Sequence, residues 1–237
     1  MIVRLLLAAL AAGLIAGMAM TPAQYVKTIP LIMQAEAYEN GDVGHDHGDA
    51  DVAAQPAHDH GEDDSMLGFG RLGDTILANL VAGAGFALML AAAALLTGIE
   101  FPAGREAVMR GLLLGAGAWF CVQLAPALSL PPAVPGFPYA DLGDRQGWWV
   151  MTVFASAFGL WCVAMRPEWL VKALGFAVIV APHLWGSPVP EDLSSEVPAY
   201  IASAYAAASL ATTLFFWLLL GGLLGHFLSR VPRDAEA

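Results

Sequence analysis

The sequence predicts an all-α, polytopic integral membrane protein: a bundle of six transmembrane helices with a long, flexible outer loop rich in His and Asp. Two observations support this fold class. First, 58% of the 237 residues are hydrophobic, 13% are charged, and the mean hydropathy is +0.63, which is too apolar for a soluble domain. Second, the apolar residues form runs that approach or exceed the roughly 20 residues needed to cross a hydrocarbon layer. Membrane lipid is therefore the expected solvent.

The first apolar run, residues 5–20, has two interpretations. Arg4 precedes it and small residues end it at positions 16–19, a pattern shared by a retained membrane helix and a cleaved signal peptide. We expect the retained helix, which gives six spans, whereas cleavage would leave five. In both cases the next segment is delivered to the same side of the membrane.

The other five runs are expected to complete one bundle. They occupy residues 75–97, 108–128, 148–165, 169–185 and 200–228. The runs at 148–165 and 169–185 are separated only by Arg166, Pro167 and Glu168, so we expect these two runs to form an antiparallel hairpin. Glycines spaced as GxxxG let helix backbones approach closely. They occur at Gly13/Gly17, Gly111/Gly115 and Gly221/Gly225.

The runs divide the chain into segments whose orientation follows from charge. Alternate loops hold seven Lys and Arg on one side and three on the other, and the more basic side is expected to be cytoplasmic. Both termini then face the cytoplasm. The expected segments are a first membrane helix or signal anchor (1–20), an external loop (21–74), the helix bundle (75–230) and a cytoplasmic tail (231–237). The other outer loops are 129–147 and 186–199.

Tryptophans cluster at the ends of the predicted helices. Such positions are typical of the interfacial belt, where an amphipathic ring sits at the level of the lipid headgroups. The four residues are Trp148, Trp149, Trp169 and Trp185. We interpret them as membrane anchors.

The acidic character of the chain is concentrated in residues 21–74. This segment holds eleven acids and two bases, a net charge of −9 out of −11 for the whole chain. There is no basic patch to hold phosphates, so nucleic acid is not an expected partner, whereas cations are.

Residues 44–64 repeat the pattern His-Asp-His-Gly, each time followed by acids. Neutral imidazole suits Co, Ni, Cu and Zn, and carboxylates complete the coordination of harder ions. The absence of Cys argues against a copper(I) site, and the irregular spacing argues against a rigid structural zinc site. The segment is thus predicted to collect borderline divalent ions, with candidate ligands His45, His47, His58, His60, Asp46 and Asp59. The alternative is a solvated acidic loop whose histidines are incidental.

Polar groups at membrane depth are costly and often functional. Gln123 lies near the end of the third run, followed by Pro126, which removes a backbone donor and frees a carbonyl. His183 lies near the outer end of the fifth run, although an interfacial role is the alternative. Glu36 and Glu39 would share one face of a short outer helix, either as a second metal station or as a solvated face.

The chain lacks the sequence motifs of nucleotide binding and of hydrolysis. There is no GxxxxGK[ST], so no ATP site of the P-loop type is expected. There is also no GxSxG or HExxH, and the sequence does not predict an enzyme. The two cysteines, Cys121 and Cys162, lie within apolar runs, where a thiol behaves as a small hydrophobe.

Several segments, in chain order, resemble the CbtA family, the proposed larger membrane subunit of a bacterial cobalt transporter. They are PLIMQAEAYE, the His-rich loop, LAPALSLPPAVPG, DRQGWW, APHLWGSP and SLATTLFFWLLLGGLLG. The resemblance implies Co²⁺ as substrate, with no permanently bound cofactor, and a link to cobalamin supply. It also implies a partner, a small single-helix His-rich CbtB-like subunit. The family is usually described with five membrane segments, one fewer than the runs seen here.

Together these observations predict cobalt uptake across the bacterial inner membrane. In this hypothesis the outer loop captures the ion, and Gln123 and His183 form a weaker station inside the bundle. The alternatives are a metal-sensing or metal-buffering scaffold, a Ni²⁺ or Zn²⁺ carrier, and an exporter.

Overall fold

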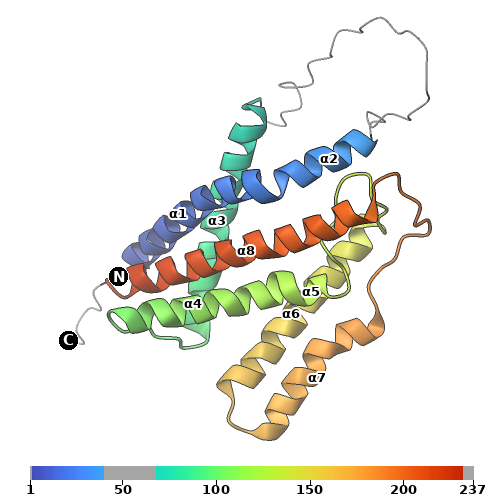
Figure 1. Ribbon diagram of the computed structural model, residues 1–237. Coiled ribbons are helices and arrows are strands. Elements are labelled where there is room, and N and C mark those ends of the chain that lie inside the picture. The colour runs from blue at the N-terminus through green and yellow to red at the C-terminus, as the bar shows by residue number, and fades with distance from the viewer. Residues whose placement is uncertain (1, 40–67, 232–237) are drawn as a thin grey trace, which may run out of the picture.

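The computed structural model describes residues 2–39 and 68–231, and all regular elements in these ranges are helices (Figure 1). The helices in chain order are α1 (Ile2–Lys27), α2 (Ile29–Glu39), α3 (Gly70–Leu96), α4 (Arg105–Trp119), the π-helix η1 (Phe120–Leu124), α5 (Ala125–Ala127), α6 (Leu142–Met165), α7 (Trp169–Trp185) and α8 (Ala199–Leu228). The predicted all-α bundle is confirmed.

All six apolar runs are helical. Five helices are long and apolar enough to cross a membrane: α1, α3, the continuous segment from α4 to α5, α6 and α8. The sixth, α7, is also apolar but has only 17 residues. Helix α1 continues past Pro22 to Lys27, and α2 follows directly, so the start of the segment predicted to be a loop from residue 21 is helical.

Four long helices form the centre of the bundle. Figure 1 shows α1, α8 and α4 side by side, with α3 crossing behind them. Their buried core combines small residues of α1, such as Ala12 and Ala16, with large side chains of α8, such as Trp217 and Leu220. Phe86 of α3 packs against Trp217 with the ring centroids 5.0 Å apart. Small residues facing large ones allow these helices to interdigitate.

The GxxxG glycines lie at two close helix contacts. Gly13 of α1 meets the backbone of Gly83 in α3, and Gly111 of α4 meets the backbone of Gly221 in α8. In both pairs the helices are antiparallel, because Gly17 meets Asn79 and Gly115 meets Trp217. A Cβ atom at these glycines would overlap a carbonyl oxygen of the neighbouring helix. The predicted role of the motifs in close packing is confirmed.

Helices α6 and α7 form the expected antiparallel hairpin. Three non-helical residues, Arg166, Pro167 and Glu168, join them, and Gly159 of α6 meets the backbone of Gly175 in α7. The hairpin lies at one edge of the molecule (Figure 1), where α6 contacts η1 and α5.

The described parts of the predicted outer loops gather at one end of the bundle (Figure 1). A small buried cluster is formed by Ala35 of α2, Val134 of the loop before α6, Val197 just before α8 and Ile201 in the first turn of α8. The Ser195 hydroxyl donates to the carbonyl of Gly136 at 2.9 Å. We call this end of the bundle, made of α2, residues 128–141 and residues 186–198, the cap.

Candidate functional site

The main predicted metal ligands fall outside the described residues. These are His45, His47, His58, His60, Asp46 and Asp59. Within residues 2–39 and 68–231, no three His, Cys, Asp or Glu side chains lie together as a metal site. In the described part of the chain, a candidate metal ligand therefore acts alone or in a pair.

The two predicted acidic ligands of α2 have protein neighbours. The carboxylate of Glu36 accepts two hydrogen bonds from Arg71 Nη2, at 3.0 and 3.2 Å, which tie α2 to the start of α3. Glu39 lies against Gly136 of the cap, whose φ of +70° favours glycine. A metal ion at Glu36 would have to compete with the guanidinium.

Tyrosines in the cap are poor anionic ligands. The nearby phenol of Tyr200 raises the pKa of Tyr38, and burial raises the pKa of Tyr139, although Arg145 acts in the opposite direction. The guanidinium of Arg145 lies 4.7 Å from the Tyr139 ring centre. Both phenols therefore stay protonated near neutral pH.

Gln123 lies in the π-helix η1, partly buried, where the chain between α4 and α5 is bulged. Pro126 has no backbone N–H, so it cannot donate to the carbonyl of Val122 four residues earlier. The Trp149 indole of α6 donates to that carbonyl instead, at 3.2 Å. The Val122 carbonyl, which Pro126 leaves without a backbone donor, is thus hydrogen-bonded to a side chain. Besides its predicted role as an interfacial anchor, Trp149 therefore links α6 to η1.

His183 occupies the last turn of α7 and is held by two other segments. Its Nδ1 lies 2.8 Å from the hydroxyl of Ser129, which follows α5. The Trp148 ring of α6 packs edge-on against the imidazole, with ring centroids 5.8 Å apart. Trp148 is 6% exposed, so it is a buried contact and not the interfacial anchor that the sequence suggested.

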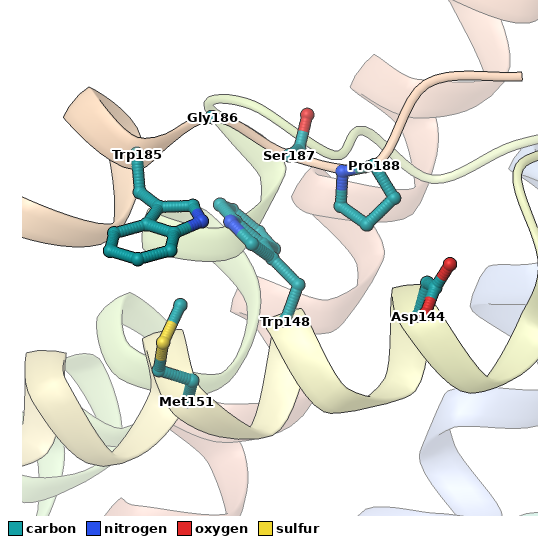
Figure 2. Close-up of a pocket in the computed structure, with 7 residues that line it drawn as sticks. All are labelled: Asp144, Trp148, Met151, Trp185, Gly186, Ser187 and Pro188. Carbon is teal, nitrogen blue, oxygen red and sulfur yellow. The ribbon is translucent and has the colours of Figure 1, made fainter.

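A pocket of about 370 Å³ adjoins this cluster (Figure 2). Trp148 and Ser187 line it and also belong to the His183 surroundings, since the Ser187 hydroxyl donates to the carbonyl of Ser129 at 2.6 Å. Figure 2 shows the Trp148 indole between Trp185 and Pro188, while Asp144 and Met151 project from the turns of α6 on either side of Trp148. One carboxylate and one thioether therefore line the pocket.

Four residues that contact His183, bind its partner Ser129 or line the adjoining pocket were not predicted from the sequence as site residues. They are Ser129, Asp144, Trp148 and Ser187. A signal was present, because these residues lie in LAPALSLPPAVPG, DRQGWW and APHLWGSP, three separate motifs that also carry the family resemblance. The structure brings the three motifs together at the cap. No described contact joins Gln123 to His183.

Comparison with known proteins identifies a family. A family model described as "Probable cobalt transporter subunit (CbtA)" matches residues 2–229, nearly the whole chain. No curated protein and no solved structure matches.

Proposed function

The chain belongs to the CbtA family of probable cobalt transporter subunits, and from this membership we propose that it carries Co²⁺ across the bacterial inner membrane in the direction of uptake. The family match over residues 2–229 is the observation that carries the proposal. A multi-pass helical chain without a nucleotide-binding motif is the expected form of such a subunit.

In the proposed mechanism, residues 44–64 collect the ion outside the cell. Four imidazoles and neighbouring carboxylates raise the local concentration of divalent metal at the mouth of the bundle. Both termini are cytoplasmic in this arrangement, and the cap faces outward. The excess of Lys and Arg in the opposite loops supports this orientation.

The ion then passes a weaker station at which His183 and Gln123 act, one in α7 and the other in η1, without a described contact between the two side chains. A weak site suits conduction, because an ion must be able to leave it. A single imidazole held by Ser129 and Trp148 meets this requirement, since the described residues around it include no second imidazole.

The chain is proposed to act with a partner. The family description names a subunit, and we propose that the partner is a small, single-helix, His-rich CbtB-like protein. Energy for uptake then has to come from outside this chain or from the ion gradient, because the sequence contains no P-loop.

Cobalt accumulation tests the proposal. Cells producing the chain, with and without the small partner, are given radioactive Co²⁺ and compared with cells carrying an empty vector. We expect accumulation above the vector, and a reduction at low cobalt when the four histidines of residues 44–64 are replaced. His183→Gln should also lower uptake, whereas His226→Gln, a histidine near the end of α8, serves as the matched control.

Other outcomes would select the alternatives. Metal binding without accumulation would contradict transport and favour a sensing or buffering scaffold. Faster loss of preloaded cobalt would indicate an exporter. Strong inhibition of cobalt flux by Ni²⁺ or Zn²⁺, together with flux of the competing ion, would make that ion the substrate.

A further inference from the structure

Two buried polar atoms beside each other in the fold have no protein partner among the described residues. They are Nε2 of His183 and Nε1 of Trp148, whose rings are in edge-on contact. Buried polar groups are nearly always hydrogen-bonded, so each of these atoms is a candidate to bind a water, ion or ligand. Both atoms therefore need a partner from outside the described protein atoms, and the rings that carry them are in contact.

The second ring nitrogen of His183 has a protein partner. Nδ1 of His183 lies 2.8 Å from Ser129 Oγ. The backbone of Ser129 is itself held, because its N–H donates to the carbonyl of Pro126 at 3.2 Å and its carbonyl accepts from Ser187. The hydroxyl is therefore presented to the ring from a constrained position.

We propose that Ser129 is a positioning residue that accepts a hydrogen bond from Nδ1–H of His183, so that the lone pair of Nε2 binds a divalent cation. A neutral imidazole carries one N–H, and the hydrogen bond made by one nitrogen decides which lone pair is free. Histidines that bind metal almost always donate their other N–H to an oxygen in this way. The inference rests on the proposed function and assigns the atom that would touch the ion.

Trp148 completes the site from the other side. Its ring packs edge-on against the imidazole, and its indole N–H is only a donor, so its partner is an oxygen such as that of a water accompanying the ion. Asp144 lines the adjoining pocket together with Trp148 and adds a carboxylate to it. The site thus offers one nitrogen ligand and leaves the remaining positions to water, which keeps binding reversible.

The tautomer of His183 is directly measurable. The chain is labelled with ¹⁵N-histidine in lipid nanodiscs, in a background with His45, His47, His58 and His60 replaced by Asn, and the signal lost in His183→Gln is assigned to His183. We expect a protonated Nδ1 and an unprotonated Nε2, and a shift confined to Nε2 when Zn²⁺ is added as a diamagnetic probe. A protonated Nε2, or no response to Zn²⁺, would overturn the inference.

Three substitutions separate positioning from general structural support. Ser129→Ala should mix the tautomers and weaken Zn²⁺ binding at His183 by roughly 10- to 100-fold, the usual cost of losing an outer-shell partner. Ser129→Thr keeps a hydroxyl and should restore both readouts. Ser187→Ala removes one of the hydrogen bonds that hold the Ser129 backbone but none to the imidazole, so it should change the tautomer less than Ser129→Ala does. Equal effects of Ser129→Ala and Ser187→Ala would contradict a positioning role.

The same variants distinguish this inference from the transport proposal. If the Nε2 shift appears but cells accumulate no cobalt, transport fails and the binding site stands. If cells accumulate cobalt while Nε2 remains protonated, transport stands and the site is wrong.

Discussion

Gly221 shows how a single missing side chain positions two helices. A Cβ atom there would overlap the carbonyl oxygen of Gly111 and approach the Cα of Gly115 to 3.0 Å. Both obstacles are backbone atoms, which cannot turn aside as a side chain can. The contact between α4 and α8 therefore depends on glycine at this position.

Gly221→Ala should destabilise the protein by about 1–3 kcal/mol, the usual cost of adding a methyl group to a tightly packed contact. The expected result is a lower midpoint of thermal unfolding in detergent. Gly85→Ala in α3 is the matched control, because nothing lies within 4 Å of a Cβ there. This control should be neutral or gain up to about 1 kcal/mol from the better helix propensity of Ala. Similar losses in both variants would contradict the packing argument.

Protonation of individual histidines should control the proposed collector. An imidazole binds metal only when unprotonated, and the ordinary histidine pKa is about 6.5. Co²⁺ binding to the chain should therefore weaken as the pH falls from 7.5 to 5.5, and replacing His45, His47, His58 and His60 should remove most of this dependence. Calorimetric titration at several pH values measures it. Binding that does not change with pH would argue for carboxylate ligands alone.

At the scale of helices, the bulge η1 depends on a contact between two elements. Pro126 cannot donate to the Val122 carbonyl, and Trp149 of α6 does so instead. Trp149→Phe keeps an aromatic side chain, smaller than the indole, but removes the N–H, which should cost about 1–3 kcal/mol for a carbonyl left unpaired. Thermal unfolding measures this loss, with the exposed Trp169→Phe as a control that should change little.

A double-mutant cycle sharpens this test. Pro126→Ala restores a backbone N–H that can reach the Val122 carbonyl, so Trp149→Phe should cost less in that background. The interaction energy isolates the hydrogen bond from the cavity that the smaller Ala leaves. Additive losses in the double variant would show that Trp149 acts through packing alone.

The arrangement of the whole molecule predicts which segments share a side of the membrane. Glu191 lies in the exposed part of the cap, and Ala103 lies in the loop before α4. Glu191→Cys should react with a membrane-impermeant maleimide in intact spheroplasts, whereas Ala103→Cys should react only after the membrane is opened. The native Cys121 and Cys162 are buried, so they should contribute little maleimide labelling of their own. The reverse pattern would invert the proposed topology.

The role of the segment between α2 and α3 is also a property of the whole molecule. If residues 44–64 only concentrate ions, their deletion should reduce cobalt uptake at low metal and leave the maximal rate nearly intact. Initial rates over a range of Co²⁺ concentrations give both quantities. A collapse of the maximal rate would place the segment in the translocation path.

The amino-acid sequence by itself determined which segments become membrane helices and that α6 and α7 form a hairpin. Both features are local. A bilayer requires long apolar runs, and a connection of three residues, Arg166, Pro167 and Glu168, is too short to cross the membrane before the next run begins. The short helix α2 was likewise expected from the local sequence PLIMQAEAYE. The continuation of α1 past Pro22 was not expected, since proline usually ends a helix.

Only the tertiary structure decided which side chains meet. Ser129, Trp148 and His183 come from three segments, and each has an ordinary local role as a loop residue, an interfacial ring or a helix-end histidine. The same holds for Glu36, whose partner Arg71 is 35 positions away. Helix periodicity tells which residues face inward, but not which helix they face, because lipid-embedded runs are similarly apolar. The neighbours are selected by close fits such as Gly111 against Gly221, which depend on both surfaces at once.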